Sequence, residues 1–252
     1  MPFTVSHAAA VLPLHRWSRC KLPLSALMIG SMAPDFAYFY SHAAERLVTH
    51  SVHGLFTFAW PVGFCVWWLY VRFLEEPTIA LLPEPWCRRF APTGKLTLRL
   101  FAWVSTAIIA GAATHILWDA FTHRSTFITG NFPIFHAHVP GMRWLPVFEV
   151  LQVLSSIFGL VVLWRWAMNL RRAPETSYES PYPVTDRQRL AVLGILMGGA
   201  FVLAMTYWLT HLRYRFDAQI FMFFIGGMSG WVVAWFVVAA WLRSKKAAQF
   251  AP

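Results

Sequence analysis

Charged residues are scarce in this chain. Of its 252 residues only 13% are charged and only eleven are acidic, whereas 58% are hydrophobic. An ordinary soluble domain carries roughly 25% charged residues. The composition therefore excludes a conventional soluble domain and predicts a membrane protein, with membrane lipids around it as partners.

Cysteine is nearly absent as well, and the basic residues do not form a nucleic-acid surface. Cys20, Cys65 and Cys87 have no paired spacing, so we expect neither a disulfide nor a thiolate metal site. The net charge is +10, but the Lys and Arg residues do not cluster with stacking aromatic residues on a polar segment. Nucleic acid is not an expected partner.

Hydrophobic runs, in contrast, are abundant. A helix needs about 20 residues to cross a hydrocarbon core of ~30 Å. Five stretches are apolar over such a length: 54–74, 98–118, 148–170, 190–210 and 219–242. The expected fold class is all-α, a polytopic helical membrane protein with five long transmembrane helices preceded by a pair of short helices.

The short helices are expected at 5–15 and 22–34, on either side of a polar turn at 16–21. If they pack antiparallel, His7 and Asp35 lie near the same level at the open end of the hairpin. We expect three parts of the chain: a helical membrane domain that holds the site (1–170), a cytoplasmic linker (171–189) and a two-helix membrane scaffold (190–252).

The basic residues are distributed unevenly among the loops. Thirteen lie around the loops near 75–97 and 171–189 and at the C-terminal end, whereas the intervening loops carry only Arg124, Arg143, Arg213 and Arg215. By the positive-inside rule the richer side is cytoplasmic. The sequence thus predicts a protein of the bacterial cytoplasmic membrane with a cytoplasmic C-terminus, and with residues 114–147 on the outer side.

Two acidic residues lie among large apolar side chains. Asp35 belongs to "GSMAPDFAYFY" and Asp119 to "HILWDAF", whereas the other nine acids fall in loops or at segment ends where water can solvate them. An unpaired carboxylate in apolar surroundings is costly. We therefore expect a cation, from histidines or a metal ion, to offset both charges.

Histidines are placed to do this. In "THILWDAFTH", His115, Asp119 and His123 recur every four residues and so share one stripe of a helix. His7 and His50 are expected at the same, outward side. Imidazole with carboxylate is the ligand set of zinc and its neighbours, and a bridging aspartate can hold two ions. The alternative to a metal site is a polar cluster that caps the end of the helix.

Several motifs resemble a known bacterial membrane family. "MPFTVSHAAAVLPL", "LPLSALMIGSMAPDFAYF", "THS" at 49–51 and "HILWDAFTH" are similar to the family called domain of unknown function 4184. That family resembles the YdjM-type inner-membrane proteins, metal-dependent hydrolases with the pattern Pro-Asp-x-Asp, His-Arg-Gly-x-Thr-His-Ser and His-x-x-x-Asp. Here Ala37 stands at the second aspartate of the first motif.

The resemblance implies a set of site residues. It makes Asp35, His50, His115 and Asp119 metal ligands. A more distant similarity in the order of these residues to zinc-dependent phospholipase C and the single-strand nucleases adds His7 and His123. His136, His138 and Glu149 are further candidates without a motif.

The leading hypothesis is a membrane-embedded metal-dependent hydrolase of a phosphoester, such as a lipid head group, with zinc as the expected divalent cofactor. Asp35 or Asp119, whichever does not bridge, would be the catalytic base. Two other classes stay open: a non-enzymatic metal-binding or structural membrane protein, and a transporter. Against the transporter, both acids fall near span ends and the long spans contain no clear inverted repeat.

Overall fold

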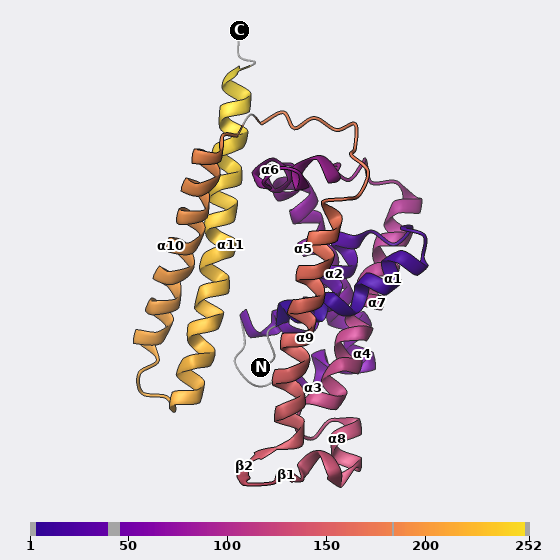
Figure 1. Cartoon of the computed structure of the whole chain (residues 1–252), viewed down its shortest axis with the longest axis vertical. Coiled ribbons are helices and arrows are strands. Elements are labelled where there is room, and N and C mark those ends of the chain that lie inside the picture. The colour runs from indigo at the N-terminus through magenta and orange to yellow at the C-terminus, as the bar shows by residue number, and fades with distance from the viewer. Residues whose placement is uncertain (1–3, 40–45, 183, 250–252) are drawn as a thin grey trace. The chain divides into compact units, whose positions relative to one another are not determined.

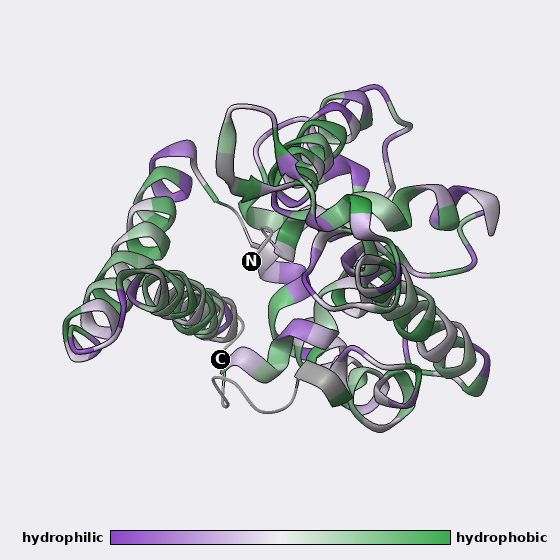
Figure 2. Ribbon diagram, turned by 90° about the horizontal axis from the view of Figure 1, so that it is seen from below, coloured by the Kyte–Doolittle hydropathy of each residue, from purple (hydrophilic) through white to green (hydrophobic). Residues whose placement is uncertain are grey.

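The computed structural model of the protein describes residues 4–39, 46–182 and 184–249 (Figure 1). Among these residues, five helical stretches are long and apolar enough to span a membrane: Val52–Leu81, Leu98–Asn131, Val147–Leu170, Asp186–Thr210 and Ala218–Lys245. Figure 2 shows how strongly hydrophobic residues dominate the long helices. The predicted all-α class, with five spans and short N-terminal helices, is confirmed.

The chain divides into two compact units. The first comprises Met1–Trp67 and Lys95–Met168, and the second comprises Trp68–Gly94 and Asn169–Pro252. The described elements of the first unit are η1 (Thr4–Val11), α1 (Leu12–Trp17), α2 (Leu24–Met32), η2 (Ala33–Phe39), α3 (Arg46–Thr49), α4 (Val52–Gly54), η3 (Leu55–Ala59), α5 (Trp60–Leu69), α7 (Leu98–Thr122), α8 (Phe127–Asn131), η6 (Pro133–His136), β1 (His138–Val139), β2 (Met142–Pro146) and α9 (Val147–Leu170). The three-part division predicted from the sequence stays a prediction.

The N-terminal helices form the predicted hairpin. Each starts or ends in a 3-10 segment, η1 leading into α1 and α2 continuing into η2. The turn between them has left-handed backbone at Arg19 and Cys20, with φ of 53° and 60°. At the open end, the Thr4 hydroxyl donates to Oδ2 of Asp35 over 2.7 Å. The hairpin therefore brings the start of η1, including His7 one turn later, to the level of Asp35.

Helices α2 and α7 pack with their backbones in direct contact. A Cβ atom on Gly30 would lie 2.4 Å from the carbonyl oxygen of Ile108, and one on Gly111 would lie 2.4 Å from that of Leu27. Neither backbone neighbour can turn away as a side chain could. Glycine at these two positions lets the helices approach closely, and Gly111 is one turn before His115.

The first span is longer than predicted. It continues beyond residue 74, where a loop was expected, as α6 (Glu75–Leu81) after the π turn η4 (Tyr70–Leu74). Pro77 is the third residue of α6, which follows directly after the π turn, where the helix departs from regular α geometry. The two-stranded β1–β2 hairpin, with Gly141 in its turn at φ 81°, was also not predicted.

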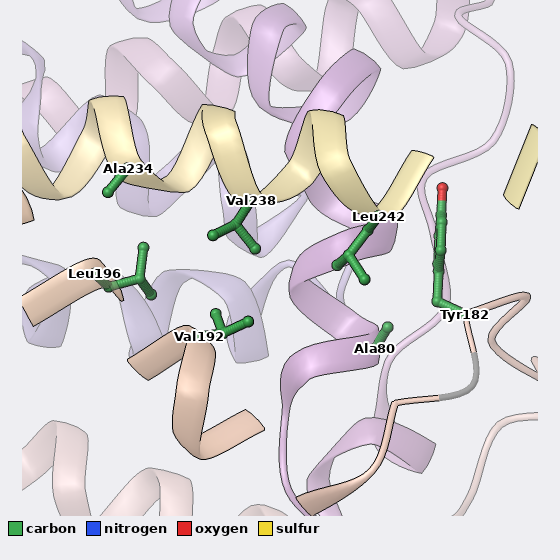
Figure 3. Packing of buried hydrophobic residues seen from close by; sticks show 7 residues of the cluster. All are labelled: Ala80, Tyr182, Val192, Leu196, Ala234, Val238 and Leu242. Atoms are coloured by element: carbon green, nitrogen blue, oxygen red, sulfur yellow. The ribbon is translucent and has the colours of Figure 1, made fainter. Parts of the chain in front are cut away.

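The second unit is built on an antiparallel pair of long helices, α10 (Asp186–Thr210) and α11 (Phe216–Gln249), together with η4, α6 and η5 (Trp86–Arg89). One core cluster joins the pair to α6 (Figure 3); its buried members are Ala80, Tyr182, Val192, Leu196, Ala234, Val238 and Leu242. The segment 171–189, which was expected to be a linker, packs within this unit. Tyr182 is buried, and the backbone N–H of Thr176 donates to the carbonyl of Arg88 over 2.8 Å.

Candidate metal centre

The six residues predicted as metal ligands all lie in the first unit, and the structure brings them together. They are His7 on η1, Asp35 on η2, His50 in the turn after α3, His115 and Asp119 on α7, and His123 at the end of α7. All except His50 are buried, and the His50 side chain is only 10% exposed.

His123 is fixed where α7 ends. The last carbonyls of a helix have no partner within it and must find one outside. Here the Thr126 hydroxyl donates to the carbonyl of Ala120, and the Thr129 hydroxyl donates to that of His123, each over 2.6 Å. The two threonines also form a capping box that starts α8. This local turn holds His123 in the same stripe as Asp119 and His115.

His115 is held in one tautomer. Its Nδ1 lies 2.7 Å from the backbone carbonyl of Ser31, which can only accept, so Nδ1 carries the proton. In the neutral ring Nε2 then has the lone pair, and this atom lies 3.5 Å from Oδ2 of Asp119 and 3.6 Å from Oδ1 of Asp35. A backbone carbonyl that accepts from the other ring nitrogen commonly orients a metal-binding histidine. The close contact of α2 with α7 thus prepares His115 as a ligand.

His50, in the turn after α3, contacts the same two carboxylates, those of Asp35 and Asp119. Its Nε2 lies 3.2 Å from Oδ1 of Asp35, 3.5 Å from Oδ2 of Asp119 and 3.3 Å from Nε2 of His115. Its Nδ1 lies 3.0 Å from the buried hydroxyl of Thr49. Nε2 of each of these two imidazoles therefore lies within 3.6 Å of an oxygen of both carboxylates.

The remaining histidines face the other oxygen of Asp119. Oδ1 of Asp119 lies 3.5 Å from Nε2 of His7 and 3.3 Å from Nδ1 of His123. The His7 ring stacks on that of His115 with centroids 4.0 Å apart, and the edge of Trp118 closes it on another side. Within the described part of the chain, neither ring nitrogen of this fully buried His7 has a hydrogen-bond partner.

Burial and neighbouring charges shape the ionisation of the two residues contributed by the N-terminal hairpin. Burial, followed by the proximity of His115, lowers the pKa of His7 to about 3, so its imidazole is neutral and available as a ligand. Burial alone would raise the pKa of Asp35, but His115 together with hydrogen bonds from His50 and Thr4 holds this pKa well below its usual range. The site therefore offers a neutral imidazole and a charged carboxylate, the forms that bind metals.

The separations within the site also match those between two ligands of one metal ion. N–H···O bonds are mostly about 2.7–3.2 Å long, whereas His50 and His115 lie 3.2–3.6 Å from the two carboxylates. Two ligands of a tetrahedral zinc ion with bonds of about 2.0–2.1 Å are about 3.3–3.4 Å apart.

Two groups of three residues have ligand atoms that all lie within 4.8 Å of one another: His7, His115 and Asp119, and Asp35, His50 and His115. In addition, neither nitrogen of His7 has a hydrogen-bond partner among the described residues. This arrangement shows that the buried His/Asp clusters can hold a metal ion. Among the described residues, the further candidates His136, His138 and Glu149 belong to neither group.

The sequence profile of one family, described as "Domain of unknown function (DUF4184)", matches residues 1–240. The chain belongs to the DUF4184 family. The match covers both compact units and all six candidate ligands. No curated protein and no solved structure matched the chain.

Several residues that shape the site of this DUF4184 protein were not predicted from the sequence. Thr4 and Ser31 act on Asp35 and His115 through single hydrogen bonds, and nothing in their local sequence indicates a role. Trp118 also shapes the site, because its ring contacts that of His7 and its Nε1 donates to the hydroxyl of Ser155 over 3.0 Å. For Gln152 the sequence did contain a signal that could have indicated a role at the site, because it is an amide within an apolar span.

Proposed function

We propose that this DUF4184 protein is a membrane-embedded metal-dependent hydrolase that cleaves a phosphoester, with zinc bound by His7, Asp35, His50, His115, Asp119 and His123. The proposal extends the resemblance of the sequence motifs to YdjM-type proteins and, more distantly, to zinc-dependent phospholipase C and the single-strand nucleases. It places the protein in a bacterial cytoplasmic membrane, with the site at the outer side and the C-terminus in the cytoplasm.

One observation carries the proposal. Asp119 directs its two oxygens to different histidines, Oδ2 to His50 and His115 and Oδ1 to His7 and His123. An aspartate placed between two sets of imidazole nitrogens is suited to bridge two ions, as in two-metal phosphoester hydrolases. A capping cluster for a helix end would not need six residues from four separate segments, nor a buried imidazole whose nitrogens have no hydrogen-bond partner among the described residues.

The residues of the chain have distinct roles in this scheme. A bound divalent ion would supply Lewis-acid polarisation of the phosphoryl group and would lower the pKa of a coordinated water. Asp119 would be the ligand shared by two ions, which leaves Asp35 as the candidate base for that water. The Thr4 hydroxyl holds Oδ2 of Asp35, which keeps Oδ1 turned towards His50 and His115. The indole of Trp118 covers His7 and helps to keep bulk water out.

A lipid head group is the substrate class that best fits this location. The ligands lie on the last two turns of α7 and on short helices packed beside it, within a protein whose long helices are suited to a bilayer. On the proposed topology, a phosphoester at the outer membrane surface would lie at the level of these ligands.

The test is hydrolysis by the purified, detergent-solubilised protein of phospholipid vesicles and of a generic phosphodiester. We expect activity that is lost on chelation, restored by added zinc and absent from Asp35→Asn. Activity that survives both chelation and Asp35→Asn would refute the mechanism. Bound metal without any hydrolysis would instead support a structural or metal-binding role.

The proposed orientation makes a separate prediction. In a cysteine-free background, Ile134→Cys should be labelled in intact cells by a membrane-impermeant maleimide, because residue 134 is 68% exposed and lies on the proposed outer side. Ser177→Cys is the matched control, since Ser177 is also exposed but belongs to the proposed cytoplasmic segment. It should be labelled only after the cells are opened. The reverse pattern would overturn the orientation.

A further inference from the structure

We propose that Gln152 of α9 is a positioning residue for the metal centre, and that its amide oxygen selects the tautomer of His123 that presents Nδ1 to the metal. The inference rests on the proposed function, because it assumes that the six residues bind metal. It adds an outer-shell partner from a span that contributes no ligand itself.

The contact is direct and lies on the far side of the His123 ring from Asp119. The side-chain nitrogen of Gln152 lies 3.2 Å from Nε2 of His123, whereas Nδ1 of the same ring lies 3.3 Å from Oδ1 of Asp119. The ring is thus held between an amide on one edge and the bridging carboxylate on the other. The Thr122 hydroxyl also lies 3.2 Å from Nδ1 and can donate to it or accept from it, so a neutral ring can adopt either tautomer there, and the group at Nε2 influences which one forms.

Gln152 is one of a stripe of polar residues on α9 that serves the site. The hydroxyl of Ser155 accepts a hydrogen bond from the indole of Trp118, whose ring covers His7. The hydroxyl of Ser156 donates to the backbone carbonyl of Gln152 over 2.7 Å. Positions 152, 155 and 156 lie on one face of the helix, since residues three and four apart are neighbours. The rest of the helix is largely apolar and suited to lipid.

The tautomer of His123 depends on what the amide of Gln152 donates or accepts. A neutral imidazole has one N–H and one lone pair, so a lone pair on Nδ1 requires a proton on Nε2 and an acceptor facing it. The two ends of a glutamine amide have the same shape, and turning the amide by half a turn places its oxygen on Nε2. Gln152 can therefore donate to Nε2 while Nδ1–H bonds to Asp119, or accept from it while Nδ1 binds metal.

The test compares zinc affinity, measured by competition with a chromophoric chelator, between wild-type protein and two variants. Gln152→Leu keeps the approximate volume and removes the acceptor, so we expect zinc to bind about 10–100-fold more weakly, the usual effect of losing an outer-shell partner. Gln152→Glu keeps an acceptor and cannot donate when ionised, so it should bind zinc within a few-fold of wild type. Ser229→Ala is the control, because it removes a similar hydroxyl bond to the carbonyl four residues earlier within a helix of the second unit, and it should match wild type.

A spectroscopic readout separates positioning from mere packing. In cobalt-substituted protein, the visible absorption of Gln152→Glu should match wild type, and that of Gln152→Leu should change because one nitrogen ligand is lost or displaced. Wild-type zinc affinity in Gln152→Leu would overturn the inference, and so would equal weakening in Gln152→Leu and Gln152→Glu. If wild-type protein itself binds no zinc, the proposed function fails and this inference fails with it.

Discussion

Replacing Asp119 with alanine should reduce the zinc affinity of the purified protein by more than about 100-fold, beyond the roughly 10–100-fold expected for an outer-shell partner. Asp119 touches all four histidines of the site through its two oxygens. Without it, Asp35 is the single carboxylate that remains among the six ligands to offset the charge of the metal. Metal content by mass spectrometry of protein purified without added metal measures the effect.

The control for this variant is His211→Ala. His211 also ends a long helix, where it caps α10 and its Nδ1 lies 2.7 Å from the carbonyl of Tyr207. It belongs to the second unit, so its removal should leave the metal content unchanged. Retention of metal by Asp119→Ala, with both variants folded, would contradict the assignment of Asp119 as the bridging ligand.

The second large effect concerns the contact between α2 and α7. Gly111→Ala should lower the free energy of unfolding by about 1–3 kcal/mol, the usual cost of overpacking a core. The added methyl group would meet backbone atoms of Leu27 and Ser31 at 2.4 and 2.7 Å, so the helices must separate. Separation would also lengthen the bond between Ser31 and His115, and zinc affinity should fall together with stability.

Gly194→Ala is the matched control for this substitution. Gly194 lies in the interior of α10, and a Cβ there would meet nothing within 4 Å. Alanine is favoured over glycine in a helix by about 1 kcal/mol, so this variant should be neutral or slightly more stable. Thermal unfolding in detergent, followed by circular dichroism, compares the two. Equal effects of both substitutions would show that α2 and α7 do not depend on close backbone contact.

The long helices and the N-terminal hairpin could be predicted from the sequence because each leaves a local signal. A span needs a continuous apolar run, and the hairpin needs two short apolar runs with a polar turn between them. The predicted end of the first span was wrong because the mixed charge and four prolines of residues 75–97, of which Pro77 is the first, were interpreted as a loop. The π turn that restarts the helix just before that proline has no comparable signal in the sequence.

The candidate ligands could be predicted for a different reason. Charge is rare in this chain, so an Asp between apolar residues or a histidine one turn from it stands out, as with Asp35, Asp119 and His115. Their partners could not be predicted, because a hydroxyl such as that of Thr4 or a carbonyl such as that of Ser31 is common anywhere. Only the close packing of η1, α2 and α7 gives these groups their role.

The most direct test of the whole account is the metal content of wild-type protein, purified in detergent without added metal or chelator. We expect at least one equivalent of zinc per chain, removed by a strong chelator and taken up again on addition of zinc. Protein that is folded, free of metal and unable to bind zinc when it is supplied would contradict the metal centre, and His115, Asp119 and His123 would then be a polar cluster at the end of a helix.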